Sequence, residues 1–182
     1  MRRPRISVYI ATSLDGFIGR PDGRVDWLGP PPEHGEEDYG YGEFMSGVDL
    51  LVMGRATFAM ALAFETWPYG DLRVLVLSNH AVPIPPPLRG TVAADAGDPA
   101  DLVAREPIAS ARHVYLDGGI TVQRFLAEGL VDDLTITTVP VLLGEGRPLF
   151  GPVGRDVPLE HVHTRTWSNG YVQTAWVLRP GG

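Results

Sequence analysis

Cysteine and lysine are both absent from this chain of 182 residues. The absence of cysteine excludes a disulfide framework, a thiol nucleophile and a thiolate zinc site. The absence of lysine excludes Schiff-base chemistry on a lysine and the lysine of a phosphate-binding P-loop. All 15 basic residues are therefore arginine, a bias that we attribute to genomic base composition. A chain without cysteine is compatible with the cytosol, so we expect a cytoplasmic protein.

Long hydrophobic runs are also missing, since no run approaches the ~20 apolar residues that a membrane helix needs. The N-terminus is basic, but its apolar run is short and is broken at Ser13-Leu14-Asp15, which is not the pattern of a signal peptide. The net charge of −7 argues against a nucleic-acid partner. We therefore expect a small-molecule ligand, and neither a membrane nor a nucleic acid as partner.

The remaining composition is ordinary for a globular protein, with 44% hydrophobic and 20% charged residues. The length suits a single domain over residues 1–182 with a sizeable core. The loop 13–27 contains two Asp-Gly pairs and a proline, so it should turn sharply, and Pro30-Pro31-Pro32 separates it from the next helix.

Apolar and β-rich runs predict strands at residues 5–12, 49–53, 73–77, 91–94, 113–117 and 134–141. Helical patterns cover residues 36–46, 98–105, 121–128 and a segment from about residue 54 to residue 64. Ser168-Asn169-Gly170 joins residues 159–167 to residues 171–178 as a hairpin. This order predicts a three-layer α/β fold, with a mainly parallel central sheet and an antiparallel C-terminal hairpin.

The rest of the chain is organised around residues 113–150. A strand, the pair Gly118-Gly119, a helix that Gly129 closes and a second strand follow one another within about 40 residues, as in a βαβ unit. A glycine pair lets backbone amides approach a ligand closely, and a helix N-terminus favours phosphate. Alone, such a pair is often only a tight turn.

Two other junctions supply the context that the glycine pair lacks. MGRAT follows the strand 49–53, and LSNH follows the strand 73–77, as LDGGIT follows the strand 113–117. Ligands of parallel α/β sheets bind beyond the carboxyl ends of the strands. The three junctions are therefore expected to converge on one crevice.

The order of these motifs resembles the dihydrofolate reductase fold family, and within it the bacterial branch related to the reductase domain of riboflavin biosynthesis. The resemblance is carried by IATSLDGFIG, DLLVMGRATF, VLVLSNH and VYLDGGITVQRFLAEGLVDDLTI, and it extends from about Ile6 to Val177. It implies a dihydrofolate reductase-like fold and NADPH as cofactor.

The resemblance also implies roles for individual residues. It places Ala11 beside the nicotinamide, Arg55 near the 2′-phosphate and Thr57 at the pyrophosphate. The complete implied cofactor-binding set is Ala11, Ile18, Gly19, Gly54, Arg55, Thr57, Ser78, Asn79, Gly118, Gly119 and Thr121. A guanidinium matches the geometry of a phosphate, although a surface salt bridge and an ordinary N-cap are the alternatives for Arg55 and Thr57.

Two carboxylates are candidates for catalysis. Asp117 matches an acidic residue of the riboflavin-type branch, and its alternative role is to accept backbone hydrogen bonds in the turn. Asp38 falls at the spacing of the acid in dihydrofolate reductases, but EEDYGYG differs from the usual pattern, and an exposed acid at a helix start is the alternative.

Three residues are candidates for the substrate pocket. Thr137 matches a family threonine that lines it, although β-propensity alone also favours threonine there. Trp27 and Tyr41 would supply an aromatic wall, or belong to the core.

No metal site is expected. His161 and His163 alternate on a predicted strand without a nearby carboxylate. The zinc deaminase that is often fused to the riboflavin enzyme has an H-x-E and P-C-x-x-C signature, which a chain without cysteine cannot provide.

The leading hypothesis is an NADPH-dependent reductase that acts on a small heterocycle of pterin or ribosylamino-pyrimidine type, similar to 5-amino-6-(5-phosphoribosylamino)uracil reductase. The alternative is a non-catalytic nucleotide- or flavin-binding homodimer that kept the fold. A homodimer is expected in both cases, because residues 139–143 and 172–177 read as long apolar edge strands that need cover.

Overall fold

A computed structural model of the chain describes residues 3–29 and 37–179. The expected proline run 30–32 and the expected helix start at Glu36 lie outside these ranges. The strands are β1 (Arg5–Ser13), β2 (Phe17–Gly19), β3 (Leu50–Gly54), β4 (Val74–Leu77), β5 (Val92–Asp95), β6 (His113–Asp117), β7 (Asp133–Val139), β8 (Arg147–Pro148), β9 (Leu159–Thr166) and β10 (Val172–Leu178). The helices are α1 (Tyr41–Ser46), α2 (Arg55–Ala61), α3 (Pro99–Leu102) and α4 (Gly119–Ala127), with 3-10 turns at η1 (Asp26–Leu28) and η2 (Pro86–Leu88).

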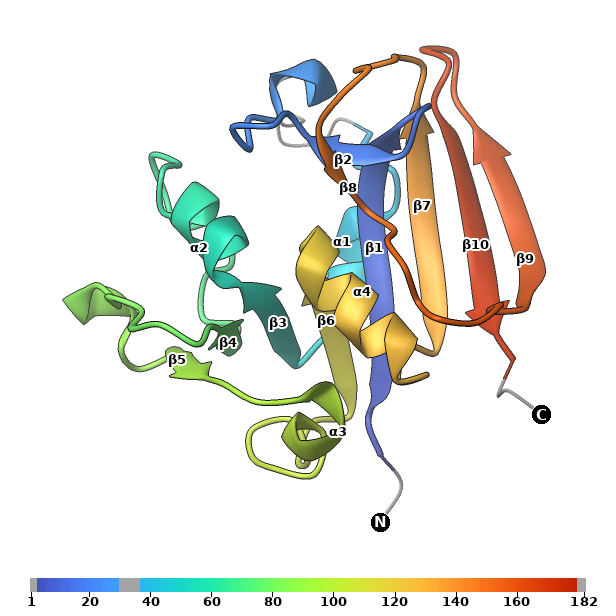
Figure 1. The fold of residues 1–182 in the computed structure, drawn as a ribbon. Coiled ribbons are helices and arrows are strands. Elements are labelled where there is room, and N and C mark those ends of the chain that lie inside the picture. The colour runs from blue at the N-terminus through green and yellow to red at the C-terminus, as the bar shows by residue number, and fades with distance from the viewer. Residues whose placement is uncertain (1–2, 30–36, 180–182) are drawn as a thin grey trace.

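Eight of these strands form one sheet in the order β5-β4-β3-β6-β1-β7-β10-β9 (Figure 1). The neighbours from β5 to β7 are parallel, and β10 runs antiparallel to both β7 and β9. The expected mainly parallel sheet with an antiparallel C-terminal hairpin is confirmed. The two strands of the βαβ unit, β6 and β7, are not neighbours, because β1 lies between them.

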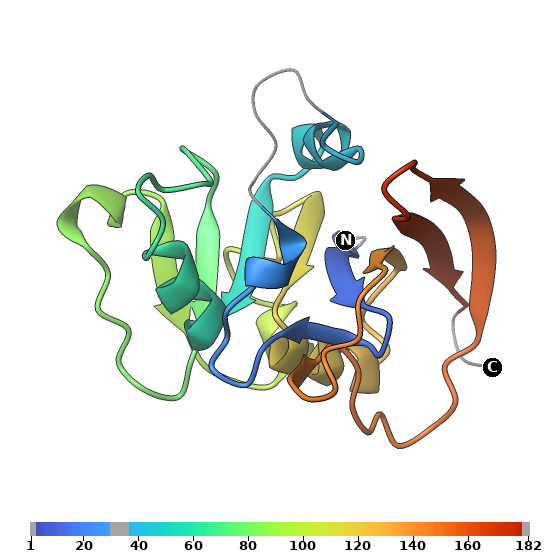
Figure 2. The ribbon, with the colours of Figure 1, turned by 90° about the horizontal axis from the view of Figure 1, so that it is seen from above.

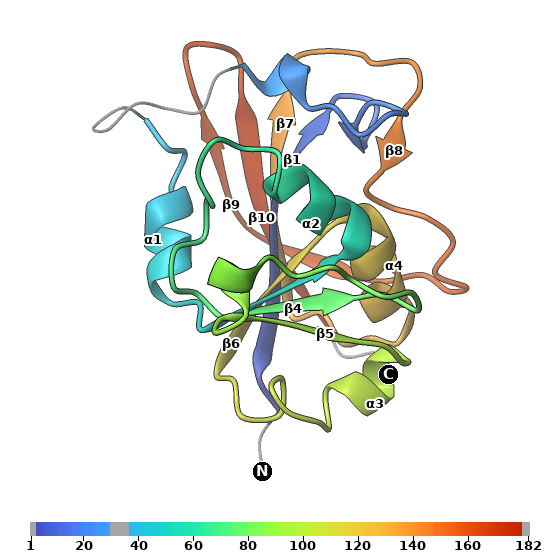
Figure 3. The ribbon, with the colours of Figure 1, turned by 90° about the vertical axis from the view of Figure 1, so that its left-hand side faces the viewer.

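Two hydrophobic cores lie on the two faces of this sheet. Side chains alternate along a strand, so Leu50 and Val52 of β3 join one core whereas Leu51 and Met53 join the other. The first core packs against α3 and α4, and the second against α1 and Phe58 of α2. Figures 2 and 3 show α1 and α4 on opposite faces of the sheet, which gives the three layers. Burial on both faces explains why β3 and β4 are continuously apolar.

Helix α4 begins and ends close to the predicted positions. It buries Val122, Phe125 and Leu126 against the sheet, which is the face that the sequence spacing indicates. Gly129, with a φ of 66°, follows its last turn and donates its amide to the carbonyl of Leu126 at 3.0 Å. A left-handed glycine at this place is a common helix terminator.

Other elements differ from the predictions. Helix α1 starts at Tyr41 instead of near Glu36, and α2 and α3 end several residues early at Ala61 and Leu102. The predicted loop 13–27 contains the strand β2, which pairs with β8 in a separate two-stranded sheet. Each of these segments is too short for hydrophobic periodicity to fix its bounds.

The expected edge strands are wrong, because β10 lies between β7 and β9 and is paired on both sides. The edge strands of this sheet are β5 and β9, and β9 is exposed along nearly its whole length and carries Leu159 and Val162 at 42% and 56% exposure. Its unpaired backbone groups offer a template for another strand. Within the described ranges, no helix has both the length and the apolar character needed to cross a membrane.

We expect a second copy of the chain to cover β9, so light scattering at micromolar concentration should give twice the chain mass of 19.8 kDa. Val162→Asp should shift the mass toward the monomer, because it places a charge on the exposed edge strand. Leu62→Asp is the control, since Leu62 is 38% exposed at the end of α2, which packs beside β3 and β4, far from β9 in the strand order. A monomer mass for the unmodified chain would contradict this expectation.

Candidate functional site

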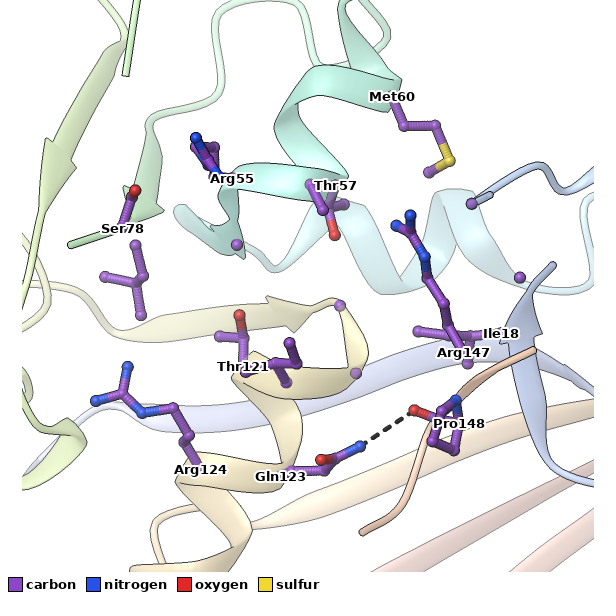
Figure 4. A pocket seen from close by; sticks show the side chains of 18 of the residues that line it. Ile18, Arg55, Thr57, Met60, Ser78, Thr121, Gln123, Arg124, Arg147 and Pro148 are labelled. Atoms are coloured by element: carbon purple, nitrogen blue, oxygen red, sulfur yellow. Dashed lines mark hydrogen bonds between the residues drawn. The ribbon is translucent and has the colours of Figure 1, made fainter. Parts of the chain in front are cut away.

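A cavity of about 630 Å3 lies at the carboxyl ends of β3, β4 and β6 (Figure 4). Its volume falls within the range of ordinary small-molecule and cofactor sites. The three junctions that the sequence singled out meet there, since Gly54, Ser78 and Gly118 all line it. The convergence expected from parallel strand order is confirmed.

The cavity brings together nearly all the residues expected to bind a cofactor. Those that line it are Ile18, Gly19, Gly54, Arg55, Thr57, Ser78, Asn79, Gly118, Gly119 and Thr121. Ala11 is the exception, because it lies on β1 opposite Thr137 of β7 and does not border the cavity.

The β3–α2 and β6–α4 junctions pack against each other through glycine and threonine. A Cβ atom on Gly118 would lie 2.6 Å from the Oγ1 atom of Thr57, and one on Gly54 would lie 3.1 Å from the Oγ1 atom of Thr121. Each junction therefore leaves out a side chain where the threonine of the other junction fits. Gly118 has a φ of 92°, which an L-residue with a side chain rarely adopts.

A second close approach covers the start of α4. A Cβ atom on Gly119 would lie 2.5 Å from the carbonyl oxygen of Pro148 in β8. The side-chain Nε2 atom of Gln123 donates to the carbonyls of Pro148 and Leu149 at 3.1 and 3.2 Å. The two-stranded sheet β2–β8 is thereby held against the N-terminal turn of α4, where it forms one wall of the cavity.

Positive charge dominates the cavity lining. Arg55, Arg124 and Arg147 border it, and the described lining contains no aspartate or glutamate, although the chain carries a net charge of −7. Arg124 donates to the carbonyl of Gly97 at 2.7 Å and pairs with Asp98 at 3.3 Å. A glycine-lined cavity with guanidinium groups and a helix N-terminus suits an anionic ligand that carries phosphates.

Asp117 stands at the end of β6, directly before this glycine turn. Its Oδ1 atom accepts a hydrogen bond from the amide of Gly118 at 2.7 Å. The surrounding protein raises the pKa of the Asp117 carboxyl to about 6, because desolvation outweighs this hydrogen bond. Such a carboxyl can donate a proton near neutral pH.

Asp117 is near enough to Tyr41 and Tyr69 for its charge to act on them. Desolvation, and then the charge of Asp117, raises the pKa of Tyr41 to about 12 and shifts the pKa of Tyr69 upward in the same way. Tyr41 lies 6.0 Å from Tyr9, measured between ring centroids, and Tyr9 stacks on Phe44 at 4.7 Å. Asp117 is therefore next to the arginine-lined cavity through Gly118, and its charge reaches aromatic residues at Tyr41 and Tyr69.

The other expected substrate residues are placed as follows. Thr137 is buried, and its hydroxyl accepts a hydrogen bond from the Nε2 atom of Gln173 at 2.9 Å. Gln173, which the sequence did not single out, also donates to the hydroxyl of Tyr9 at 2.9 Å and to the carbonyl of Tyr39 at 3.0 Å. Trp27 lies half-buried in η1, and its buried Nε1 atom has no partner among the described residues.

Asp38 is not brought to the cavity. It is exposed before α1, where its carboxylate accepts hydrogen bonds from the amides of Gly40 and Gly42 at 2.8 Å each. The amides of Gly42 and Gly40 hold the pKa of Asp38 below its usual range. The group is ionised at neutral pH, which suits a helix-start acid better than a proton donor.

Several lining residues escaped the sequence reasoning. Arg124 follows Thr121 by three residues, so the helical period places both on one face, and this signal was available. Arg147 comes from a two-residue strand, and nothing in its spacing predicts its position. Among the described residues, no cluster of three or more His, Asp or Glu side chains is arranged to hold a metal ion.

Comparison with known proteins relates this geometry to a family. The model of the RibD C-terminal domain matches residues 88–173. Protein YwjB of Bacillus subtilis (strain 168) is 32% identical over 155 residues, which are 84% of this chain and 86% of YwjB.

Solved structures show the same fold. A provisionally named riboflavin biosynthesis protein from Shewanella sp. PV-4 has a TM-score of 0.88 and 37% identity, over 97% of this chain and 99% of that one. Dihydrofolate reductase from Enterococcus faecalis, solved in complex with NADP(H), has a TM-score of 0.63 and 16% identity, over 97% of both chains. The expected dihydrofolate reductase-like fold is confirmed.

The glycine–threonine packing makes a prediction about stability. We expect Gly118→Ala to lower the free energy of unfolding by about 1–3 kcal/mol, because a positive φ is unfavourable for alanine and its methyl group would displace the Thr57 hydroxyl. Gly54→Ala is the matched control, because the φ of Gly54, −81°, suits alanine. Its cost in unfolding free energy should exceed that of an ordinary glycine substitution at a helix start by less than about 1 kcal/mol. Urea unfolding measures both.

The contribution of Thr57 can be separated from that of the backbone. Thr57→Ala in the Gly118→Ala background should recover only part of the loss, because it removes the contact but not the positive φ. Equal stability of Gly118→Ala and Gly54→Ala would contradict the larger cost expected from the positive φ and the closer approach at Gly118.

Proposed function

The chain belongs to the RibD C-terminal domain family of the dihydrofolate reductase-like fold, and from this premise we propose that it is an NADPH-dependent reductase. Its substrate would be a small heterocycle of pterin or ribosylamino-pyrimidine type. The observation that carries the proposal is the arginine-lined cavity at the glycine junctions, with a carboxyl of raised pKa beside it.

The residues of the cavity fit a dinucleotide phosphate. Gly118 and Gly119 leave space that side chains would fill, directly at the N-terminus of α4. Arg55 and Arg124 border the cavity near Ser78 and Gly97, and Arg147 borders it near Ile18 (Figure 4). When bound, NADPH would supply the hydride, and the protein supplies orientation and charge.

Individual roles follow from position. Arg55 begins α2 and lies beside Ser78 in Figure 4, so we assign it to the 2′-phosphate. Thr57 and the Gly118-Gly119 turn would hold the pyrophosphate, because this turn opens the nine-residue helix α4. Ile18 and Gly19 of β2 line the cavity and would form its wall near the reacting end of the cofactor.

Asp117 would deliver the proton that must accompany the hydride. Reduction of a C=N or C=O group needs both, and a raised pKa lets a carboxyl hold its proton near neutrality. The aromatic residues Tyr41 and Trp27 are proposed to face a planar heterocycle on this side. The alternative, a nucleotide- or flavin-binding homodimer without turnover, gives no role to the raised pKa of Asp117.

The 2′-phosphate assignment is tested by cofactor preference. Arg55→Ala should weaken NADPH binding by about 1.5–3 kcal/mol, the scale of a charge-assisted hydrogen bond, and leave NADH binding nearly unchanged. Calorimetric titration of both cofactors measures the difference. The control is Arg73→Ala, because Arg73 is exposed, makes one weak contact to a carbonyl at 3.4 Å and does not line the cavity.

Two results would contradict the assignment. Equal losses for NADPH and NADH would mean that Arg55 has a general structural role. If Arg124→Ala instead of Arg55→Ala lost the preference for NADPH over NADH, the 2′-phosphate would have to be assigned to the Gly97 end of the cavity.

The proton-donor assignment is tested by turnover. Asp117→Asn should lose at least ~10²-fold in turnover, in line with general-acid contributions, while NADPH still binds. The amide side chain can still accept the hydrogen bond of Gly118, so the turn should persist. Asp38→Asn is the matched carboxylate control and should matter less, since Asp38 lies outside the cavity. Loss of cofactor binding or of folding in Asp117→Asn would show a turn-forming role instead.

The pH dependence has a definite sign. A general acid must be protonated, so turnover should fall as the pH rises through about 6. The folded state also holds this proton more tightly than the unfolded state does. As the pH rises from 3.8 to about 6, the wild type should therefore lose stability relative to Asp117→Asn. Urea unfolding across this interval measures the second effect without any cofactor.

A further inference from the structure

Arg147 is a cavity arginine to which neither the sequence pattern nor the reductase proposal gives a role, and unlike Arg124 it has no aspartate partner among the described residues. It opens β8 and borders the cavity, and it takes part in none of the ion pairs between described residues. Its only hydrogen bond there is a weak one, from Nε to the carbonyl of Pro21 at 3.4 Å. A guanidinium that borders a cavity without a carboxylate partner is available to an anionic ligand.

The guanidinium lies against the backbone of the Gly23 turn. A Cβ atom on Gly23 would lie 2.8, 2.9 and 3.0 Å from the Nη1, Cζ and Nη2 atoms of Arg147, so the planar group packs directly over this glycine. The next residue, Pro148, approaches Gly119 and accepts the hydrogen bond of Gln123. The backbone of Arg147 is thus anchored by its neighbour, and its guanidinium lies between the Gly23 turn and the cavity.

Arg147 and Arg55 lie at different ends of the cavity. In Figure 4, the Arg147 side chain extends from β8 toward α2 on the side of Ile18 and Met60, whereas Arg55 lies beside Ser78. The peptide segment that carries Arg147 also covers the start of α4 through the contact between Pro148 and Gly119. Arg147 is therefore the cavity arginine next to the glycine turn.

We propose that Arg147 clamps the pyrophosphate of the bound dinucleotide, and that it does so from a lid formed by β2, β8 and the Gly23 turn. This inference rests on the proposed function, which it extends by separating two phosphate subsites. Arg55 reads the 2′-phosphate and confers preference, whereas Arg147 binds the pyrophosphate that NADPH and NADH share.

Four nucleotides separate the two subsites in a binding assay. ADP carries the pyrophosphate without a 2′-phosphate, and adenosine 2′-monophosphate carries the 2′-phosphate without a pyrophosphate. Arg147→Ala should weaken NADPH, NADH and ADP by a similar factor of about 10 to 100, the scale of a charge-assisted hydrogen bond, and leave adenosine 2′-monophosphate unchanged. Arg55→Ala should show the converse pattern for ADP and adenosine 2′-monophosphate.

Arg89→Ala is the matched control for the loss of one surface charge. Arg89 is exposed, donates from Nε to a carbonyl at 3.4 Å as Arg147 does, and lies outside the cavity lining. All four nucleotides should bind this variant as they bind the wild type. Arg147→Lys should fall between wild type and alanine, because lysine keeps the charge and loses the planar fork. A folded lysine variant as weak as the alanine variant would contradict a charge-based clamp.

Failure of this inference can be told from failure of the reductase proposal. If the wild type binds NADPH, and Arg147→Ala binds ADP and NADH as tightly as the wild type does, the clamp is wrong and the reductase proposal stands. If Arg147→Ala weakens adenosine 2′-monophosphate as much as ADP, Arg147 does not read the pyrophosphate. If wild type binds none of the four nucleotides, both proposals fail. Melting curves of each variant show whether folding has changed, and the lysine variant carries the test if the alanine variant is unstable.

Discussion

The close approach of two strand–helix junctions is the contact on which the rest of the site depends. Gly118 makes room for the hydroxyl of Thr57, and Gly54 for the hydroxyl of Thr121, so neither junction can move without the other. The backbone amides at the start of α4 are thereby fixed relative to Arg55, which begins α2. A larger residue at Gly118, where the approach is closest and φ is positive, would press on Thr57 and disturb the lining contributed by both junctions.

The fold was predictable because its strands are buried on both faces. Runs such as Leu50–Gly54 and Val74–Leu77 are continuously apolar, and such runs identify parallel strands with helices on either side. Strand direction then places every strand-to-helix junction at one edge, so motifs far apart in sequence were expected together and are found together. The strand order was not predictable, because β1 lies between β6 and β7 of the βαβ unit and no local sequence pattern indicates this position.

The site was predictable where residues lie on regular elements and unpredictable where they lie on short connections. The glycine junctions follow from strand ends, whereas Arg147 depends on a two-residue strand and on a packing contact with Gly23. Asp38 shows which of its two sequence readings the geometry favours, since its carboxylate accepts hydrogen bonds from two backbone amides as an acid at a helix start does. Gln173 escaped notice because a glutamine on a strand normally faces solvent, whereas here three hydrogen bonds hold it in the interior.

One peptide bond separates two electrostatic environments in this structure. On the Gly118 side, guanidinium groups border a cavity whose described lining has no carboxylate, so bound anions are favoured. On the Asp117 side, the protein desolvates a carboxyl enough to raise its pKa to about 6, so negative charge is disfavoured. A reductase of the proposed kind needs both conditions within a short distance, because it must hold a polyanionic cofactor and keep an acid protonated beside the reacting atoms. A strand end followed by a glycine turn meets this need, since the side chain of the last strand residue and the amides of the first helical turn point to different surroundings.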